Sequence, residues 1–461
     1  MTRPVWPVPG QVGHSAAPLV ADPVSPPLGD ALSDGVDGAA QRAAVHAISQ
    51  GLVDVLRDDL DWAQAHRLIA DHVRDWVHDQ AAAGRPLLPA DAQRRLAQAV
   101  YDHRYGLGVL QPYLRPDVEN IAVNGHTQTW ITYTDGRKEP GPPVADSDDE
   151  LIDWIQLLAR RGNSNREFSH ANPLLDVALP GGVRLAVVGW VSRRPHLAFR
   201  LHHLVDITVD QLTIKHRTLT TPLAQFLKAA VGARKNIIVC GEVNTGKTTL
   251  VRALANEADP DERIITLESD FELFLDHLTH RHHDVVALEA RHANSEGAGQ
   301  VTLQDLVPAS LRMNPDRLIV GEARHGELAP LLEVMYSGAR GSMATLHTHR
   351  PAHVFARVVQ LGRRAGLGLT PQDLHVMFGL AEPLIVHLSR DPATNHRYVT
   401  DVMEVGPPAD NAEPTRQHIF TPGPDGTAIP HCNISAELLD LLTRHGLDPD
   451  LLTPSDPGWT T

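Results

Sequence analysis

The chain has 461 residues, of which 42% are apolar and 21% charged, so it holds enough apolar material for several packed cores. Its 34 glycines and 35 prolines exclude a collagen-like or low-complexity chain. The formal net charge of −15 provides no overall basic surface for nucleic acid, although a local arginine stripe inside an acidic ring stays open.

The amino-terminal part of the chain predicts a leader followed by helices. Residues 1–38 hold seven prolines within the first 30 positions, and this composition predicts a disordered leader. The same residues lack the apolar centre of a signal peptide, and no apolar run approaches the length of a membrane span, so we expect a cytoplasmic protein. From 39 to 106, apolar residues such as Val73, Trp76 and Val77 recur at helical spacing and predict a helical amino-terminal domain.

The rest of the chain shows three kinds of pattern. Residues 107–210 contain short alternating stretches between glycine turns, which predict a small α+β domain. Residues 211–405 alternate apolar runs with helical segments and predict the α/β class, a mostly parallel sheet with helices on both faces. Residues 406–461 are rich in proline, glycine and aspartate and predict a variable tail. Within these blocks we expect strands at 120–123, 129–133 and 183–191, and helices at 149–161 and 435–445.

The sharpest motif is a glycine-rich loop between a predicted strand at 236–240 and a predicted helix. From Gly241 to Thr248 it has the pattern G-x-x-x-x-G-K-T, which is typical of a phosphate-binding loop. Backbone N–H groups of such a loop and the positive end of the next helix bind phosphate together. Lys247 would contact the β- and γ-phosphates, and Thr248 would give an oxygen to Mg²⁺. The residues assigned to the nucleotide are Gly241, Val243, Asn244, Thr245, Gly246, Lys247, Thr248 and Thr249.

Acidic residues end two further predicted strands. Glu268 closes the run 263–268, and Glu322 closes the run 317–322. Because the carboxyl ends of parallel strands share one edge of a sheet with the phosphate loop, both carboxylates can face one γ-phosphate. A glutamate there can orient and deprotonate the attacking water, and another acid can hold Mg²⁺ through its water shell. We assign the role of base to Glu322.

Four segments in order resemble the secretion ATPases of type II and type IV systems, and among these the branch of tight-adherence (Tad) pili. They are the phosphate loop, the acidic segment 268–272, the segment 311–324 and the segment 341–348. The connecting residues 284–297 and the stretches that begin at Tyr105 and Glu119 resemble the same family. The likeness extends from about residue 46 to residue 405.

This resemblance implies a hexameric ATPase that uses ATP and Mg²⁺, with a RecA-like phosphate-loop core and an amino-terminal domain that closes over the nucleotide. The implied partners are inner-membrane platform proteins of a pilus or secretion machine. Arginines on a moving domain would couple hydrolysis to domain rotation. The residues carried over from the family are Glu322 as the catalytic glutamate, Glu268 as the acid of the aspartate box and the metal, His347 as the γ-phosphate histidine, and Arg184 and Arg200 as arginines directed at the nucleotide.

The sequence departs from the family pattern at three positions. Ser269 stands where the aspartate box usually has Asp, and Asp270 comes one residue later. Ala339 replaces a histidine common before the last segment, and Asn244 replaces a frequent glycine. Asparagine tolerates a left-handed backbone better than other residues with a side chain, so we expect nucleotide binding to persist. Slow hydrolysis is compatible with all three departures.

Other readings of the sequence stay open. A DNA-transfer ATPase of a conjugation or uptake system would share the fold, because the fold does not determine the cargo. An ATP-binding scaffold with little hydrolysis would fit the altered acidic segment. An unrelated phosphate-loop kinase or GTPase would leave the three later segments unexplained. The histidine cluster at 277–283 can in principle bind zinc, but a solvated polar face explains it better.

Overall fold

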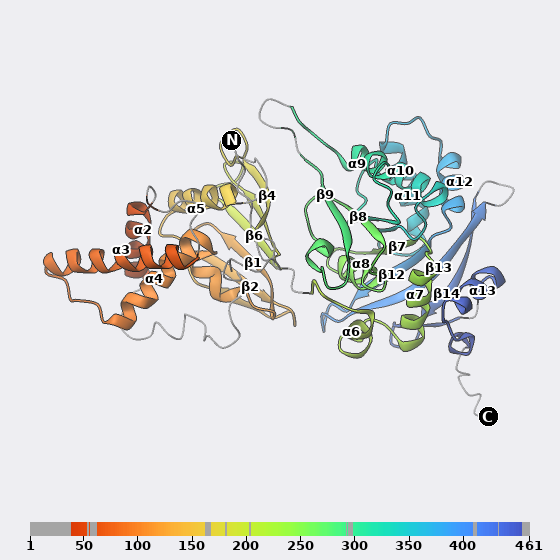
Figure 1. Ribbon diagram of the computed structural model, residues 1–461, viewed down its shortest axis with the longest axis horizontal. Helices are drawn as coiled ribbons and strands as arrows, with labels where there is room; N and C mark the ends of the chain where they lie inside the picture. The colour runs from red at the N-terminus through yellow and green to blue at the C-terminus, as the bar shows by residue number, and fades with distance from the viewer. Residues whose placement is uncertain are drawn as a thin grey trace. The chain divides into compact units, whose positions relative to one another are not determined.

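The computed structural model describes residues 38–52, 55, 62–161, 167–179, 182–201, 204–291, 293, 298–408, 413–431 and 433–453. The predicted leader, apart from Gly38, lies outside the described residues, as do residues 294–297 and Cys432. The chain divides into two compact units, Met1–His203 and Leu204–Thr461. Figure 1 shows the elements of both units in chain order.

Three long helices begin the first unit (Figure 1). They are α2 (Gly38–Gly51), α3 (Trp62–Ala82) and α4 (Ala90–Tyr105), and a short 3-10 helix, η1 (Gly108–Tyr113), follows them. One apolar stripe of each long helix is buried in a shared cluster that includes Ile48, Val73 and Val100. The helices predicted between residues 39 and 106 are therefore confirmed.

The first unit also contains a six-stranded antiparallel sheet in the order β3-β2-β1-β6-β5-β4. Alternate side chains, such as Leu185 and Phe199, share a buried cluster with Ile155 of the helix α5 (Asp148–Arg161), so this helix covers one face. Strand β5 is shorter than predicted, because Trp190 has a left-handed φ of 52° just beyond its end. The strands are β1 (Val118–Asn124), β2 (Gln128–Tyr133), β3 (Lys138–Gly141), β4 (Leu174–Leu179), β5 (Val183–Val188) and β6 (His196–Leu201).

The second unit is built on a nine-stranded sheet in the order β15-β14-β13-β12-β7-β11-β10-β8-β9. The six strands from β12 to β9 in this order run parallel, and the other three extend the sheet in antiparallel fashion. The strands are β7 (Ile237–Gly241), β8 (Arg263–Glu268), β9 (Asp284–Glu289), β10 (Arg317–Val320), β11 (Met343–His347), β12 (Leu384–Arg390), β13 (Arg397–Pro408), β14 (Pro414–Pro422) and β15 (Ala428–Pro430). The predicted α/β class is confirmed.

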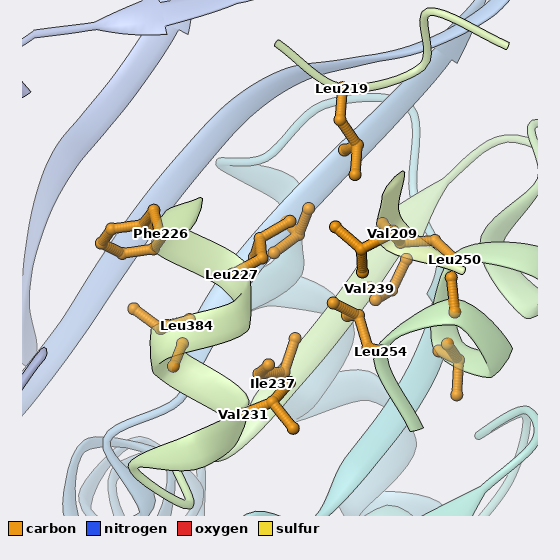
Figure 2. Close-up of a cluster of buried hydrophobic side chains, with 14 of the residues drawn as sticks. Val209, Leu219, Phe226, Leu227, Val231, Ile237, Val239, Leu250, Leu254 and Leu384 are labelled. Atoms are coloured by element: carbon orange, nitrogen blue, oxygen red, sulfur yellow. The ribbon is translucent and has the colours of Figure 1, made fainter. Parts of the chain in front are cut away.

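Helices cover both faces of this sheet. Along β7, Ile237 and Val239 join one buried cluster, whereas Ile238 and Cys240 join another on the opposite face. Figure 2 shows the first cluster, to which α6, α7, α8 and α13 contribute, and α9 to α12 contribute to the second. The helices are α6 (Val209–Ile214), α7 (Thr221–Gly232), α8 (Lys247–Ala255), α9 (Leu303–Leu311), α10 (Leu328–Ser337), α11 (His353–Arg364), α12 (Pro371–Ala381) and α13 (Ala436–Arg444), with 3-10 turns η2 (Leu275–His277) and η3 (Pro449–Leu452).

The residues after 405 belong to the same sheet as the residues before them. The boundary expected at 405/406 falls inside β13, and β14 and β15 continue the sheet beyond it. Proline and glycine gave these residues the composition of a tail, but strands near a sheet edge tolerate both. The helix expected at 435–445 is confirmed as α13. None of the helices in the described part of the chain has the length and apolarity needed to span a membrane.

Candidate functional site

The phosphate loop connects β7 to α8, at the carboxyl edge of the parallel strands. Its backbone takes positive φ angles at Gly241 (153°), Asn244 (64°) and Gly246 (91°). A Cβ on Gly241 would stand 2.5 Å from the carbonyl oxygen of Leu388, so only glycine fits there. The left-handed backbone expected at Asn244 is confirmed. The turn thus has the tight, glycine-dependent geometry in which successive N–H groups can face an anion.

Lys247 begins α8, and its side chain folds back into the loop. Its Nζ donates to the carbonyl oxygens of Gly241 at 3.2 Å and Glu242 at 2.6 Å. Thr245 also donates its hydroxyl to the carbonyl of Glu242, at 2.9 Å. Lys247 is only 6% exposed. Because a phosphate is a stronger acceptor for an ammonium group than a neutral carbonyl, a bound phosphate can take over these hydrogen bonds.

The other residues assigned to the nucleotide lie around the same turn. Thr248 and Thr249, in the first turn of α8, are half-buried, as are Asn244 and Gly246. Val243 is 68% exposed at the tip of the loop and contributes no buried contact. Thr248 therefore lies in the first turn of the helix that follows the loop, as the motif predicts.

Glu322, His347 and Lys247 are brought into one chain of contacts at the strand ends. Nδ1 of His347 lies 3.2 Å from Nζ of Lys247, and Nε2 of the same ring lies 2.8 Å from Oε1 of Glu322. Arg324 holds the other side of Glu322, with Nε 2.5 Å from Oε1 and a terminal nitrogen 2.7 Å from Oε2. Burial alone would raise the pKa of Glu322, but the hydrogen bonds from His347 and Arg324 outweigh it and lower the pKa to about 2. Glu322 is thus a carboxylate at neutral pH.

Glu268 lies at the end of β8 and binds the backbone of the segment that follows it. Its Oε2 accepts hydrogen bonds from the backbone N–H groups of Glu272 and Leu273, both at 2.8 Å, and the side chain is 2% exposed. Burial raises its pKa to about 7, although the two backbone hydrogen bonds act in the opposite direction. Its Oε1 accepts from the hydroxyl of Thr266 at 3.3 Å. In this arrangement both carboxylate oxygens of Glu268 are used within the protein, and Oε2 holds the backbone of the acidic segment.

Arg184 and Arg200 lie in the first unit, where the structure brings them together. They occupy directly opposed positions on β5 and β6, and Arg200 is also opposed by Asn120 on β1. Both arginines are half-buried on the sheet face that points away from the apolar cluster. Two arginines at opposed positions on one sheet face are suited to an anionic ligand.

Sequence reasoning missed the roles of two arginines in the second unit. Arg324 ends the segment 311–324 that carries part of the resemblance, and its position two residues after Glu322 was a signal that it could pair with that carboxylate. Arg397, the first residue of β13, contacts Asn244 of the phosphate loop. No sequence signal could have found it, because 153 positions separate the two residues.

The histidines at 277–283 each have a different neighbour and do not share a helix. His280 contacts Asp206 at 3.1 Å and His283 contacts Asp261 at 2.7 Å. His282 is buried and lies 2.9 Å from the side-chain oxygen of Asn256, and burial lowers its pKa to about 4. Within the described ranges, no group of three or more His, Cys, Asp or Glu side chains is arranged to hold a metal ion. The polar-face interpretation holds for the exposed members and is wrong for His282.

Comparison with known proteins places the chain in a family. The model of the family described as type II/IV secretion system protein matches residues 183–390, which include every site residue assigned above except Arg397. A putative conjugal transfer protein of Mycobacterium tuberculosis is 33% identical over 302 residues, which are 63% of this chain and 82% of that protein. The chain belongs to the type II/IV secretion system protein family.

Other members of the type II/IV secretion system family are also similar to the chain. Protein VirB11 of Agrobacterium fabrum is 28% identical over 332 residues, which are 65% of this chain and 91% of that protein. The crystal structure of the VirB11 ATPase from the Brucella suis type IV secretion system covers 66% of this chain at 25% identity, with a TM-score of 0.35 and 95% of that chain covered. The family assignment rests on the sequence matches.

Proposed function

We propose that the protein is an ATPase that drives a type II/IV secretion or pilus-assembly machine, with the second unit as its RecA-like core. The observation that carries the proposal is the chain of contacts from Lys247 through His347 to Glu322. It joins the phosphate-loop lysine to a carboxylate at the edge where ligands of parallel sheets bind. Family membership supports the same reading, and the glycine-dependent turn at Gly241 fits a phosphate group.

Each side chain then has a distinct task. Lys247 binds the β- and γ-phosphates, and His347 contacts the γ-phosphate from β11. Glu322 orients the attacking water as a hydrogen-bond acceptor, and it becomes an effective base when its contacts with Arg324 and His347 loosen, since a pKa of about 2 makes a weak base. Mg²⁺, when bound, would neutralise phosphate charge, with Thr248 as its protein ligand. Glu268 fits that role less well, because Oε2 accepts two backbone hydrogen bonds and Oε1 accepts one from the hydroxyl of Thr266.

The assembly follows from the resemblance. We propose a homo-hexamer of the tight-adherence pilus type, which acts on the cytoplasmic side of a membrane through platform proteins. In the proposed division, a helical domain (39–106) and an α+β domain that begins at 107 precede the ATPase core. The boundary expected at 210/211 falls inside α6, so the core begins with the second unit at Leu204, and it extends past 405 through β13, β14 and β15. Arg184 and Arg200 reach the nucleotide when the amino-terminal part closes, and hydrolysis drives the rotation. The opposed positions of the two arginines on one sheet face support this role.

Mg²⁺-dependent ATP turnover of the full chain, measured together with particle mass, tests the proposal. Lys247→Ala removes the phosphate contact, so we expect both nucleotide affinity and turnover to fall, turnover by at least about a hundredfold. Glu322→Gln keeps the size and hydrogen bonding of the side chain but removes the carboxylate, so turnover is lost while Mg·ATP still binds. Glu333→Gln, an exposed change on α10, is the matched control and leaves both unchanged. Equal turnover in all four proteins would refute the proposal.

A DNA-transfer ATPase is the second candidate. The Mycobacterium tuberculosis relative carries the name of a putative conjugal transfer protein, and the family serves several cargoes. The formal net charge of −15 disfavours broad contact with nucleic acid. Stimulation of turnover by single-stranded DNA, lost at raised salt, would favour this candidate over a pilus motor.

An ATP-binding scaffold with little hydrolysis is the third candidate. The low pKa of Glu322 favours it, because a carboxylate held by Arg324 and His347 abstracts protons poorly. Tight Mg·ATP binding by the wild type with no turnover, even after membrane partners are added, would select the scaffold.

A further inference from the structure

An arginine from outside the phosphate-loop motif holds the middle of that loop. Nε of Arg397 donates to the main-chain oxygen of Asn244 at 2.9 Å, and a terminal nitrogen donates to Oδ1 of the same residue at 3.2 Å. The Cδ atom of Arg397 lies 3.4 Å from where a Cβ would stand on Gly246. The guanidinium group therefore packs along the loop and engages two acceptors of one loop residue.

The strand that carries Arg397 is itself fixed. Val399, two residues on, donates its backbone N–H to the carbonyl of Thr218 at 3.0 Å. Nε2 of His396 donates to the carbonyl of His216 at 3.2 Å. Because hydrogen bonds on both sides of Arg397 anchor the start of β13, the guanidinium group approaches the loop from a defined position.

The contact with Arg397 explains why position 244 has asparagine and not glycine. Asn244 has a φ of 64°, a conformation that glycine adopts without strain and that other residues rarely adopt. Glycine, however, has no side-chain oxygen for Arg397 to bind. Asparagine tolerates the left-handed backbone and supplies that oxygen. The residue at 244 therefore allows a side-chain hydrogen bond between the loop and Arg397 that glycine would not allow.

We propose that Arg397 is a positioning residue for the phosphate loop, which acts through Asn244 to hold the loop in its anion-binding conformation before the nucleotide arrives. A loop held in this way loses less conformational freedom on binding, so Arg397 increases nucleotide affinity and leaves the chemical step almost untouched. The inference rests on the proposed nucleotide binding. It extends the site to a residue beyond the segment 183–390 that the family model matches.

The test compares Arg397 with its neighbour across the hairpin. Arg390 is opposed to Arg397 in the register of β12 and β13, but its guanidinium group donates to Asn395 and acts on the loop only through its charge near Glu242, so it controls for charge without the contact to Asn244. We expect Arg397→Gln to raise the Kd for Mg·ADP and the KM for Mg·ATP about tenfold, with kcat within about twofold of the wild type. Arg390→Gln leaves all three values unchanged. Arg397→Lys, which keeps one donor, recovers part of the affinity.

The Asn244 arm of the test separates the pair from a general effect of charge. Asn244→Gly relieves the backbone yet loses the oxygen, so we expect binding about threefold weaker, although glycine is frequent in such loops. In this background Arg397→Gln costs about threefold instead of tenfold, because the main-chain acceptor remains. Full additivity of the two changes, or a kcat that falls as much as the affinity, would overturn the inference.

Two further results discriminate between failures. If the wild type bound neither Mg·ADP nor Mg·ATP, the proposed function and this inference would fall together. If the wild type bound both and Arg397→Gln matched Arg390→Gln, this inference alone would fall. An unfolding temperature of nucleotide-free Arg397→Gln equal to that of Arg390→Gln is also expected, and a large drop limited to Arg397→Gln would assign the residue to stability instead.

Discussion

The two sheets of the protein present their candidate residues in different ways. In the second unit, Lys247, His347 and Glu322 follow the ends of parallel strands and contact one another, so each is fixed by neighbours of the same unit. In the first unit, Arg184 and Arg200 stand within antiparallel strands, side by side on the face without the apolar cluster. The residues at the strand ends are thus positioned by neighbours of their own unit, whereas the arginine pair, on the sheet face opposite the apolar cluster, is suited to an anion that another part of the protein binds.

The largest expected effect tests the arginine pair on β5 and β6. Arg184→Gln and Arg200→Gln each remove a guanidinium group that we propose stabilises charge on the transferred phosphoryl group. Turnover should fall by about a hundredfold to a thousandfold, since an arginine in such a role has effects of this size. Both side chains are half-buried on an open face, so the free energy of unfolding should change by less than about 0.5 kcal/mol. Steady-state turnover and urea unfolding provide the two measurements.

The control for this pair is Arg193→Gln. Arg193 is an exposed arginine of the same unit, located in the turn before β6, so its loss changes the net charge by the same amount. If Arg193→Gln slowed turnover as much as the other two variants, the effect would be one of overall charge. The proposed role of Arg184 and Arg200 at the transferred phosphoryl group would then be refuted.

A smaller effect tests how Arg324 controls the orientation and the pKa of Glu322. Arg324→Gln removes the two contacts that help to hold the pKa of Glu322 at about 2, so that pKa should rise towards the ordinary value for glutamate. We expect turnover at neutral pH to fall about tenfold, because the loss of the fixed orientation of Glu322 outweighs the gain in its basicity. The acid limb of the kcat–pH profile should move to higher pH, because Glu322 must be ionised to act and is protonated more easily in the variant.

Arg364→Gln is the control for this change. Arg364 is a nearby exposed arginine that donates to the carbonyl of Arg324 at 3.5 Å and does not contact the Glu322 carboxylate. Its replacement should leave the pH profile of the wild type intact. An unshifted acid limb in Arg324→Gln would mean that Arg324 does not control the ionisation of Glu322.

The same contrast explains what sequence could predict. Gly241 to Thr248 form a motif whose residues are adjacent in the chain, and the carboxyl ends of parallel strands share one edge of a sheet. The placement of Lys247 and Glu322 at the same edge therefore followed from the pattern alone. Alternation predicted the strand that holds Arg184, whereas Arg200 was assigned from the resemblance alone, and only the register of β5 with β6 makes the two residues neighbours. Register depends on pairing between distant segments, which a single sequence does not reveal.

Two features of the site could not be predicted from the sequence, and the reasons are related. Arg397 approaches Asn244 only because β13 pairs with β12, which in turn pairs with β7, and neither pairing leaves a local signal. Glu268 was expected to face a metal, yet it accepts hydrogen bonds from Glu272 and Leu273. A strand-end acid can turn either to a ligand or to the backbone of its own loop, and residue type alone does not decide between them.

The smallest expected effect sharpens this reading of Glu268. Its folded pKa of about 7 lies above the ordinary value of 4.5, so the folded state binds the proton more tightly than the unfolded state does. The stability associated with this proton is fully present below pH 4.5 and is lost as the pH rises through 7. Between pH 5.5 and pH 8 the wild type should therefore lose about 2 kcal/mol through this group.

Glu268→Gln removes that titration and should flatten the dependence of stability on pH. Urea unfolding of the full chain at pH 5.5 and at pH 8 measures the difference, and exposed Glu333→Gln should keep the slope of the wild type. At pH 5.5, where the carboxyl group of the wild type is protonated, the two proteins should be about equally stable, because the amide oxygen of the variant can accept the N–H groups of Glu272 and Leu273. If the dependence of stability on pH were the same in Glu268→Gln as in the wild type, the carboxyl group would not titrate in this buried position. The assignment of Glu268 to the metal would then be favoured again.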